Sequence, residues 1–75
     1  MFGAPVATYR ELRAAIRRRR ESMGLAPSDV DASAGLASGH QERLERGISN
    51  FRKATLGPVL DALNLSLELR PRARA

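Results

Sequence analysis

The chain contains no cysteine. Neither disulfide bonds nor a cysteine-ligated metal site can therefore stabilise its fold. One histidine and no cluster of acidic residues leave no ligand set for zinc or calcium, so we expect neither a metal nor another cofactor. At 75 residues the chain forms one small domain, near the lower size limit at which a hydrophobic core is sufficient. A partner chain is therefore expected.

Long hydrophobic runs are also missing. No stretch approaches the ~20 apolar residues that span a bilayer. The N-terminal MFGAPVATYR has no basic segment ahead of a long apolar run, which a signal peptide would have. We therefore expect a cytoplasmic protein with no membrane partner.

The residue types needed for catalysis are not found at useful spacings. The sequence offers no nucleophile with a plausible base, no suitably spaced pair of carboxylates, and no glycine-rich phosphate loop after a strand. The sequence therefore predicts a protein that is not an enzyme.

Basic residues outnumber acidic ones, 13 to 8, which gives a formal net charge of +5, and all but one of the basic residues are Arg. This excess favours an anionic partner, with nucleic acid first among the candidates. The alternative is that the protein comes from an arginine-rich proteome, in which Arg replaces Lys on solvated faces. Charge alone leaves both interpretations open.

The first predicted helix spans residues 9 to 23. Thr8 and Glu11 have the spacing of a capping box, which satisfies free N–H groups at a helix start. Gly24 is its stop signal. The predicted apolar stripe of this helix consists of Leu12, Ile16 and Met23.

A second helix is predicted to begin at Pro27, because a proline in the first turn loses no hydrogen bond. Val30 and Ala34 are expected to face inward. Gly35 is predicted to end this helix after less than two turns, since glycine readily adopts a positive φ.

A third helix is predicted to begin at Ser38, which has capping-box spacing to Gln41. Leu44 and Ile48 are expected to form its buried face. It should end near residue 46, with Gly47 beyond it.

The remaining chain predicts a loop, a fourth helix and a short strand. Phe51 is expected to fill part of the core from the loop. Thr55 is a predicted cap of the fourth helix, with Pro58 in its first turn. The residues expected to pack from this helix are Val59, Leu60 and Leu63.

Alternation of apolar and polar residues in LSLEL predicts a short strand with Leu65, Leu67 and Leu69 on one face. Since a single strand has no pairing partner in its own chain, we expect it to pair with its twofold mate in a homodimer. The predicted organisation is a flexible segment at 1–7, a helical domain at 8–64, a dimerisation strand at 65–71 and a flexible basic tail at 72–75.

Two short helices joined by a glycine-containing turn, between longer helices, form a helix-turn-helix pattern. The runs that carry a family resemblance are LRAAIRRRRESMGL, AGL, RLERG and TLGPVLDALNLSLEL. Through them the chain is similar to small transcription regulators of the lambda-repressor-like (XRE, Cro/C1) family. It is most similar to the short branch with a C-terminal strand, which includes HipB-type antitoxins.

The resemblance implies an all-α, compact domain of four to five helices, with the C-terminal β-strand paired across a dimer. It implies a sequence-specific regulator that binds double-stranded DNA as a homodimer, either a repressor or an antitoxin-like autoregulator. The third helix would enter the major groove. A toxin or another regulatory protein is a further candidate partner.

The residues with predicted DNA contacts fall into two groups. Arg43 can present two donors to guanine, and His40 can donate to a base or a phosphate. Phosphate contacts need only charge or N–H groups. The predicted base-facing residues are Ser38, Gly39, His40 and Arg43. The predicted phosphate-binding residues are Arg17, Arg18, Arg19, Arg20 and Arg46.

Four positions depart from the family pattern: Ala26, Pro27, Asp31 and Gln41. Gln41 stands where an aliphatic residue is usual, and an unpaired buried polar group costs about 1–3 kcal/mol. One interpretation makes Gln41 a capping partner of Ser38 at the helix mouth. The other is a domain that has lost its DNA target and acts as a protein-interaction module, an adaptor or antiactivator. Asp31 and Glu42 also add negative charge near the predicted DNA face.

Overall fold

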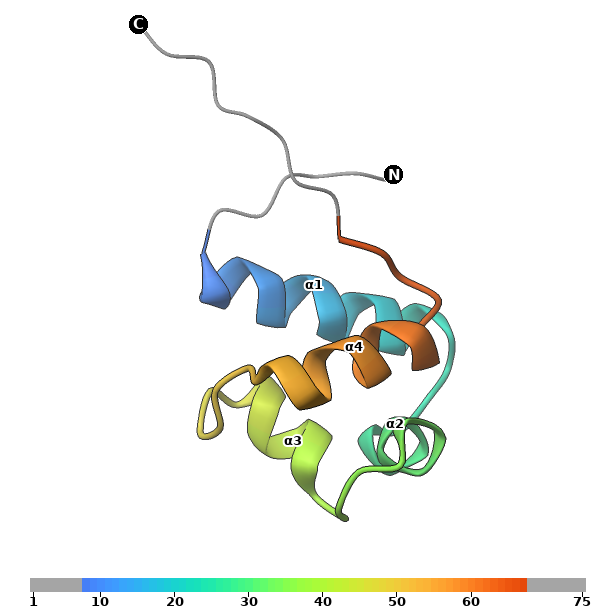
Figure 1. Cartoon of the computed structure of the whole chain (residues 1–75). Helices are drawn as coiled ribbons and strands as arrows, with labels where there is room; N and C mark the ends of the chain where they lie inside the picture. Colours follow the sequence, from blue (N-terminus) through green and yellow to red (C-terminus); the bar gives the residue numbers. More distant parts are fainter. Residues whose placement is uncertain (1–7, 68–75) are drawn as a thin grey trace, which may run out of the picture.

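The computed structural model describes residues 8–67, without the side chain of Lys53. This part of the chain folds into four helices and contains no strand (Figure 1). The helices are α1 (Tyr9–Ser22), α2 (Pro27–Ala34), α3 (His40–Glu45) and α4 (Lys53–Ala62). The predicted compact all-α class is confirmed for the described residues.

Helix α1 has the local signals that the sequence predicts. The Glu11 N–H donates to Thr8 Oγ1 at 3.1 Å, and this bond caps the helix start. The helix ends at Ser22, and Gly24 follows with φ of 69°. Met23 is the C-cap residue and is 39% exposed, so its predicted place in the apolar stripe is wrong. Leu25, two residues later, packs against the core instead.

Helix α2 begins at Pro27, as predicted, and Asp29 accepts a hydrogen bond from the Ala26 N–H at 2.8 Å. Gly35 ends the helix with φ of 68°. The eight residues make slightly more than two turns, instead of fewer than two. Val30 is fully buried and Ala34 is half-buried, so both face inward.

Helix α3 is capped from α2, and the predicted capping box of Ser38 and Gln41 is wrong. The N-cap residue is Gly39, with φ of 85° and no side-chain cap. Asp31 instead accepts two backbone hydrogen bonds, from the N–H of Gly39 at 3.0 Å and from that of Gln41 at 2.8 Å. A carboxylate is favourable at the positive end of a helix. Asp31 therefore fixes α3 relative to α2.

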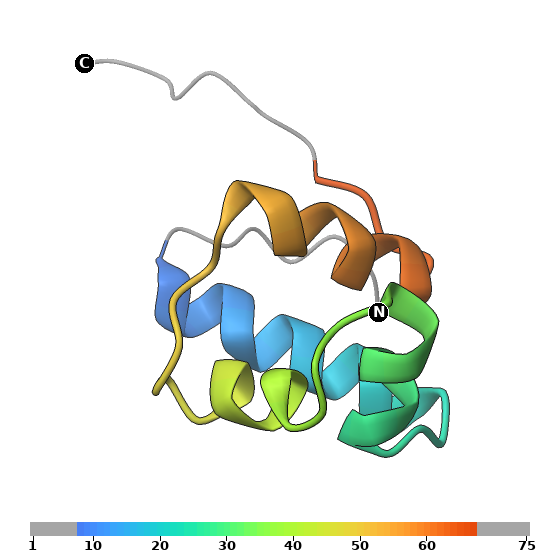
Figure 2. The same cartoon turned by 60° about the horizontal axis from the view of Figure 1, so that its bottom comes forward.

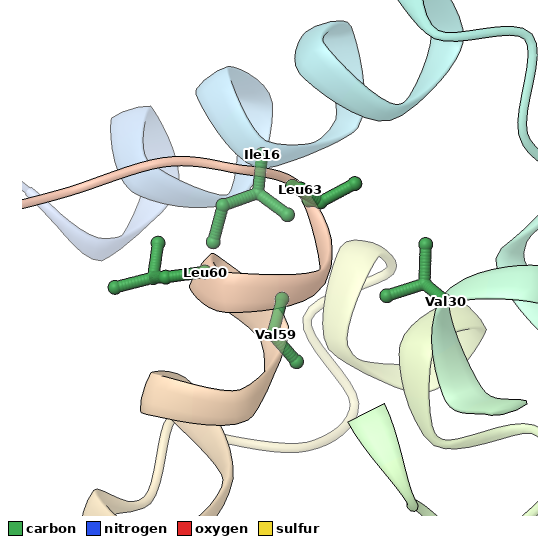
Figure 3. Packing of buried hydrophobic residues seen from close by; sticks show 5 residues of the cluster. All are labelled: Ile16, Val30, Val59, Leu60 and Leu63. Carbon is green, nitrogen blue, oxygen red and sulfur yellow. The ribbon is translucent and has the colours of Figure 1, made fainter. Parts of the chain in front are cut away.

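The hydrophobic core joins α1, α2 and α4. Figure 3 shows the side chains that form it: Ile16, Val30, Val59, Leu60 and Leu63. Their exposed fractions do not exceed 8%, and Leu44 of α3 is also buried. The predicted packing of Leu44 and of the three α4 residues is thus confirmed. Ile48 is 64% exposed, so its predicted burial is wrong; α3 ends at Glu45, and Ile48 follows Gly47, whose φ is 77°.

Helix α4 begins earlier than predicted. Its N-cap residue is Arg52, without a side-chain cap, so the expected capping by Thr55 is wrong. Thr55 lies inside the helix and its hydroxyl donates to the Arg52 carbonyl at 3.3 Å. Pro58 consequently falls in the second turn instead of the first. Phe51 packs on the core, as predicted, and stacks on Tyr9 with ring centroids 5.9 Å apart.

The described end of the chain contains no part of the predicted strand. Residues 65–67 form neither helix nor strand. Leu65 packs against the core and Leu67 is 50% exposed. Leu69 lies outside the described residues, as do the segments predicted to be flexible at 1–7 and 72–75. Strand pairing in a dimer stays a prediction.

No helix within residues 8–67 combines the length and the apolar character needed to cross a membrane.

Candidate nucleic-acid interface

Helix α3 lies at one edge of the domain, beside α2, and the loop after it leads to α4 (Figures 1 and 2). Gln41 and Leu44 form its buried side. Glu42, Arg43 and Arg46 are exposed. The helix therefore presents a charged face to the solvent, while its other side packs against the domain.

A hollow of about 450 Å³ lies between α3 and the loop of residues 48–52. It is lined by His40, Arg43, Ile48, Ser49, Asn50 and Arg52. Two Arg side chains, a hydroxyl and an amide supply the donors that contacts to bases and phosphates require. The structure thus brings two of the predicted base-facing residues together with loop residues that the sequence interpretation missed.

Gly39 and Ser38, the other two predicted base-facing residues, do not line this hollow. A Cβ atom at position 39 would lie only 2.9 Å from Nη1 of Arg43, and the φ of 85° at this position favours glycine. The Gly39 N–H is already bonded to Asp31. Ser38 is exposed and precedes the N-cap residue, outside the hollow. Position 39 therefore shapes the surface around Arg43.

The imidazole of His40 is half-buried, and its Nδ1 atom is buried without a hydrogen-bond partner among residues 8–67. A DNA contact through this ring would therefore use Nε2.

Arg20 is buried, which argues against the phosphate contact that the sequence predicts for it. Its guanidinium forms two hydrogen bonds with the Glu45 carboxylate, at 2.7 and 2.8 Å, and a third with the Leu25 carbonyl at 2.7 Å. Only 10% of the Arg20 side chain and 7% of the Glu45 side chain are exposed. This buried ion pair ties α1 to the end of α3 and holds the guanidinium of Arg20 inside the domain, away from DNA.

The surroundings of Glu45 favour its ionised carboxylate. Burial acts against the charged carboxylate, but hydrogen bonds from Arg20 and Gln41, with the charges of Arg20 and Arg17, outweigh it. The pKa of Glu45 is therefore lowered from its ordinary value. The hydrogen bond to Glu45, partly opposed by desolvation, raises the pKa of Arg20.

Gln41 belongs to the same buried network. Its side chain is fully buried, and Nε2 donates to Glu45 Oε2 at 2.8 Å. Its Oε1 atom has no partner in the described part of the chain. The interpretation of Gln41 as a capping partner at the helix mouth is wrong. The amide of Gln41 thus hydrogen-bonds the carboxylate that holds Arg20.

The other predicted phosphate-binding residues lie in different surroundings. The Nε group of Arg19 donates to the Leu63 carbonyl at 3.0 Å and so links α1 to the end of α4. Arg17 pairs with Glu21 at 3.3 Å, with both side chains more than half exposed. Arg18 is exposed and lies outside both hollows, so we do not include it among the proposed contacts with DNA. Arg46, the C-cap residue of α3, is exposed, and its Nη1 lies 3.9 Å from Oε1 of Glu42.

A second hollow, of about 280 Å³, lies between α1 and the end of α3. Its lining residues are Arg10, Arg13, Ala14, Arg17, Glu45, Arg46 and Gly47. The sequence interpretation placed the basic surface of α1 at residues 17–20 and missed Arg10 and Arg13. Their spacing to Arg17, at i, i+3 and i+7, puts all three on one helix face and was the available signal.

No protein-family model matches this chain, and no curated protein matches it.

Proposed function

We propose that the protein is a sequence-specific regulator of transcription that binds double-stranded DNA as a homodimer, in the manner of lambda-repressor-like proteins. One observation carries the proposal: the hollow of α3 and its following loop gathers Arg43, Arg52 and His40 with the polar residues Ser49 and Asn50. This combination suits a surface that reads bases with the helix and holds phosphates with the loop.

Helix α3 is suited to the reading role because the major groove accommodates an α-helix. Arg43 lies on its exposed face, where a guanidinium can donate two hydrogen bonds to guanine. Arg52 and Asn50 follow in the loop, where contacts with phosphate would set the register.

Three of the residues that depart from the family pattern have structural roles. This favours DNA binding over the alternative of a domain that has lost its DNA target. Asp31 is 3% exposed and caps α3, so its charge is engaged inside the domain. Gln41 is buried against Glu45. Pro27 occupies the first turn of α2, where it costs no hydrogen bond. Glu42 is the acidic residue of α3 that remains exposed.

A protein-interaction module is the second candidate function, and Ile48 favours it. This apolar side chain is 64% exposed and lines the same hollow as Arg43. An adaptor or antiactivator would bury it against a partner protein. In the first candidate function Ile48 would contact a thymine methyl or the sugar backbone.

Selection of bound sequences from a random duplex library tests the proposal, followed by affinity measurements on the selected site. We expect Arg43→Ala to cost about 1–3 kcal/mol on that site and to relax discrimination at one base pair. Binding to unrelated DNA should change much less. Arg18→Ala removes an equal charge outside both hollows and is the matched control.

Equal losses on selected and random DNA would make Arg43 a phosphate contact and refute the proposed reading face. If the wild-type protein selects no sequence and binds no duplex, the interaction module becomes the better explanation.

A further inference from the structure

The hollow between α1 and the end of α3 carries an unusual concentration of positive charge. Four Arg side chains line it: Arg10, Arg13, Arg17 and Arg46. Neighbouring like charges on one helix face destabilise the helix. Such a cluster is therefore unfavourable in the isolated protein unless an anion lies among the side chains.

The acidic residue in the lining, Glu45, offsets only part of this charge, because its carboxylate is already paired with Arg20. Glu45 already accepts hydrogen bonds at both carboxylate oxygens, two from Arg20 and one from Gln41. Two of the lining Arg residues have acidic neighbours on their own helices, at 3.3 Å for Arg17 and 3.9 Å for Arg46. Both of these pairs are exposed, so solvent screens them.

Arg13 is the residue that points most directly to a ligand. Its guanidinium packs over Gly47, where a Cβ atom would lie 3.7 Å from Arg13 Cζ. Its Nε atom is buried and has no hydrogen-bond partner among residues 8–67. The Nε atom is covered by the protein, so a bound oxyanion would accept hydrogen bonds from the Nη groups of Arg13, which lines the hollow.

The two hollows adjoin through consecutive residues, since Gly47 lines this one and Ile48 lines the hollow at α3. We propose that the hollow at Arg13 is a second anchoring site, which receives a DNA backbone phosphate beside the duplex segment read by α3. This inference rests on the proposed DNA-binding function and extends its contact surface onto the N-terminal half of α1. Arg suits the site because its planar fork matches phosphate oxygens.

The test is the salt dependence of affinity for a random-sequence duplex, measured by fluorescence anisotropy with the full chain. The variants are Arg13→Gln and Arg10→Gln, and the matched control is Arg18→Gln, which removes the same charge from α1 outside the hollow. Each phosphate contact contributes about 0.9 to the slope of log K against log salt. We expect both hollow variants to flatten the slope by about this amount, and the control to change it much less.

Arg10 is exposed, so its variant tests the site even if Arg13→Gln lowers the stability of the fold, which circular dichroism will show. The ¹⁵Nε resonance of Arg13 should also shift when DNA is added. If Arg18→Gln flattened the slope as much as the two hollow variants, the effect would come from net charge alone, and the proposed phosphate site would be refuted. Unchanged slopes in both hollow variants, with wild-type binding intact, would overturn this inference alone. Absence of wild-type DNA binding would overturn it together with the proposed function.

Discussion

Replacing Asp31 with Ala tests the link between α2 and α3 that orients the predicted reading helix. The carboxylate accepts two backbone hydrogen bonds, at 2.8 and 3.0 Å, and is 3% exposed. An N-cap residue contributes about 0.5–2 kcal/mol, and a hydrogen bond to a charged group about 1.5–3 kcal/mol. Because water cannot readily replace so buried a carboxylate, we expect Asp31→Ala to lower the free energy of unfolding by about 2–4 kcal/mol.

The loss is large relative to the whole stability of such a domain, which is on the order of 4–11 kcal/mol for 75 residues. Thermal and urea denaturation followed by circular dichroism will measure it, with a fall in Tm on the order of 10–25 °C. Asp31→Asn keeps one acceptor oxygen and should lose roughly half as much.

Two controls calibrate this measurement. Asp29→Ala removes a single exposed cap bond and should cost about 0.5–1 kcal/mol. Asp61→Ala removes an exposed charge on α4 and should cost less than about 0.5 kcal/mol. If Asp31→Ala were no more destabilising than Asp61→Ala, the buried cap would not hold α3 and the reasoning would be refuted.

The other predictions concern the buried network and the assembly. The pKa of Glu45 is lowered below its ordinary 4.5, so its contribution to stability is present above that value and is lost as pH falls through the folded-state pKa. Glu45→Gln should therefore be less stable at neutral pH, and its Tm should fall less than that of the wild type on acidification; parallel Tm curves would contradict this. Gln41→Leu should fold and change the free energy of unfolding by less than about 1.5 kcal/mol, because the lost bond to Glu45 is offset by removal of an unpaired buried oxygen. Gln41→Glu adds a carboxylate beside Glu45 and should lower the free energy of unfolding, measured by urea denaturation, more than Gln41→Leu does. A smaller loss for Gln41→Glu would disprove the buried contact. A chain truncated after Asn64 should be monomeric or unfolded in ultracentrifugation, since it lacks the predicted pairing strand; a stable truncated dimer would refute the strand model.

The basic surface of the domain is not formed by the whole run of four Arg residues at 17–20. Arg20 is buried in an ion pair and Arg19 bonds the Leu63 carbonyl, so two of the four stabilise the fold. Arg10 and Arg13 instead share a hollow with Arg46. The residues available to an anion are therefore distributed over α1, α3 and the loop after α3.

Local signals in the sequence determined much of the helical framework. The cap at Thr8, the proline at the start of α2 and the positive φ of Gly35 involve atoms within one helical turn, so neighbouring residues suffice to predict them. The packing of Val59 and Leu63 follows from helical periodicity in the same way. The start of α4 was predicted less well, because Arg52 provides no side-chain cap that a pattern could reveal.

Only the tertiary structure decided the roles of the polar residues. Asp31 caps α3 across eight to ten residues, and Arg20 pairs with Glu45 across 25. Whether such a side chain is buried and bonded or exposed and free depends on which helices pack beside it, and residue spacing along one helix does not encode that. Gln41 is an example. From the sequence it suggested a domain that has lost its DNA target, but in the fold it hydrogen-bonds the Glu45 carboxylate, which holds α1 to α3.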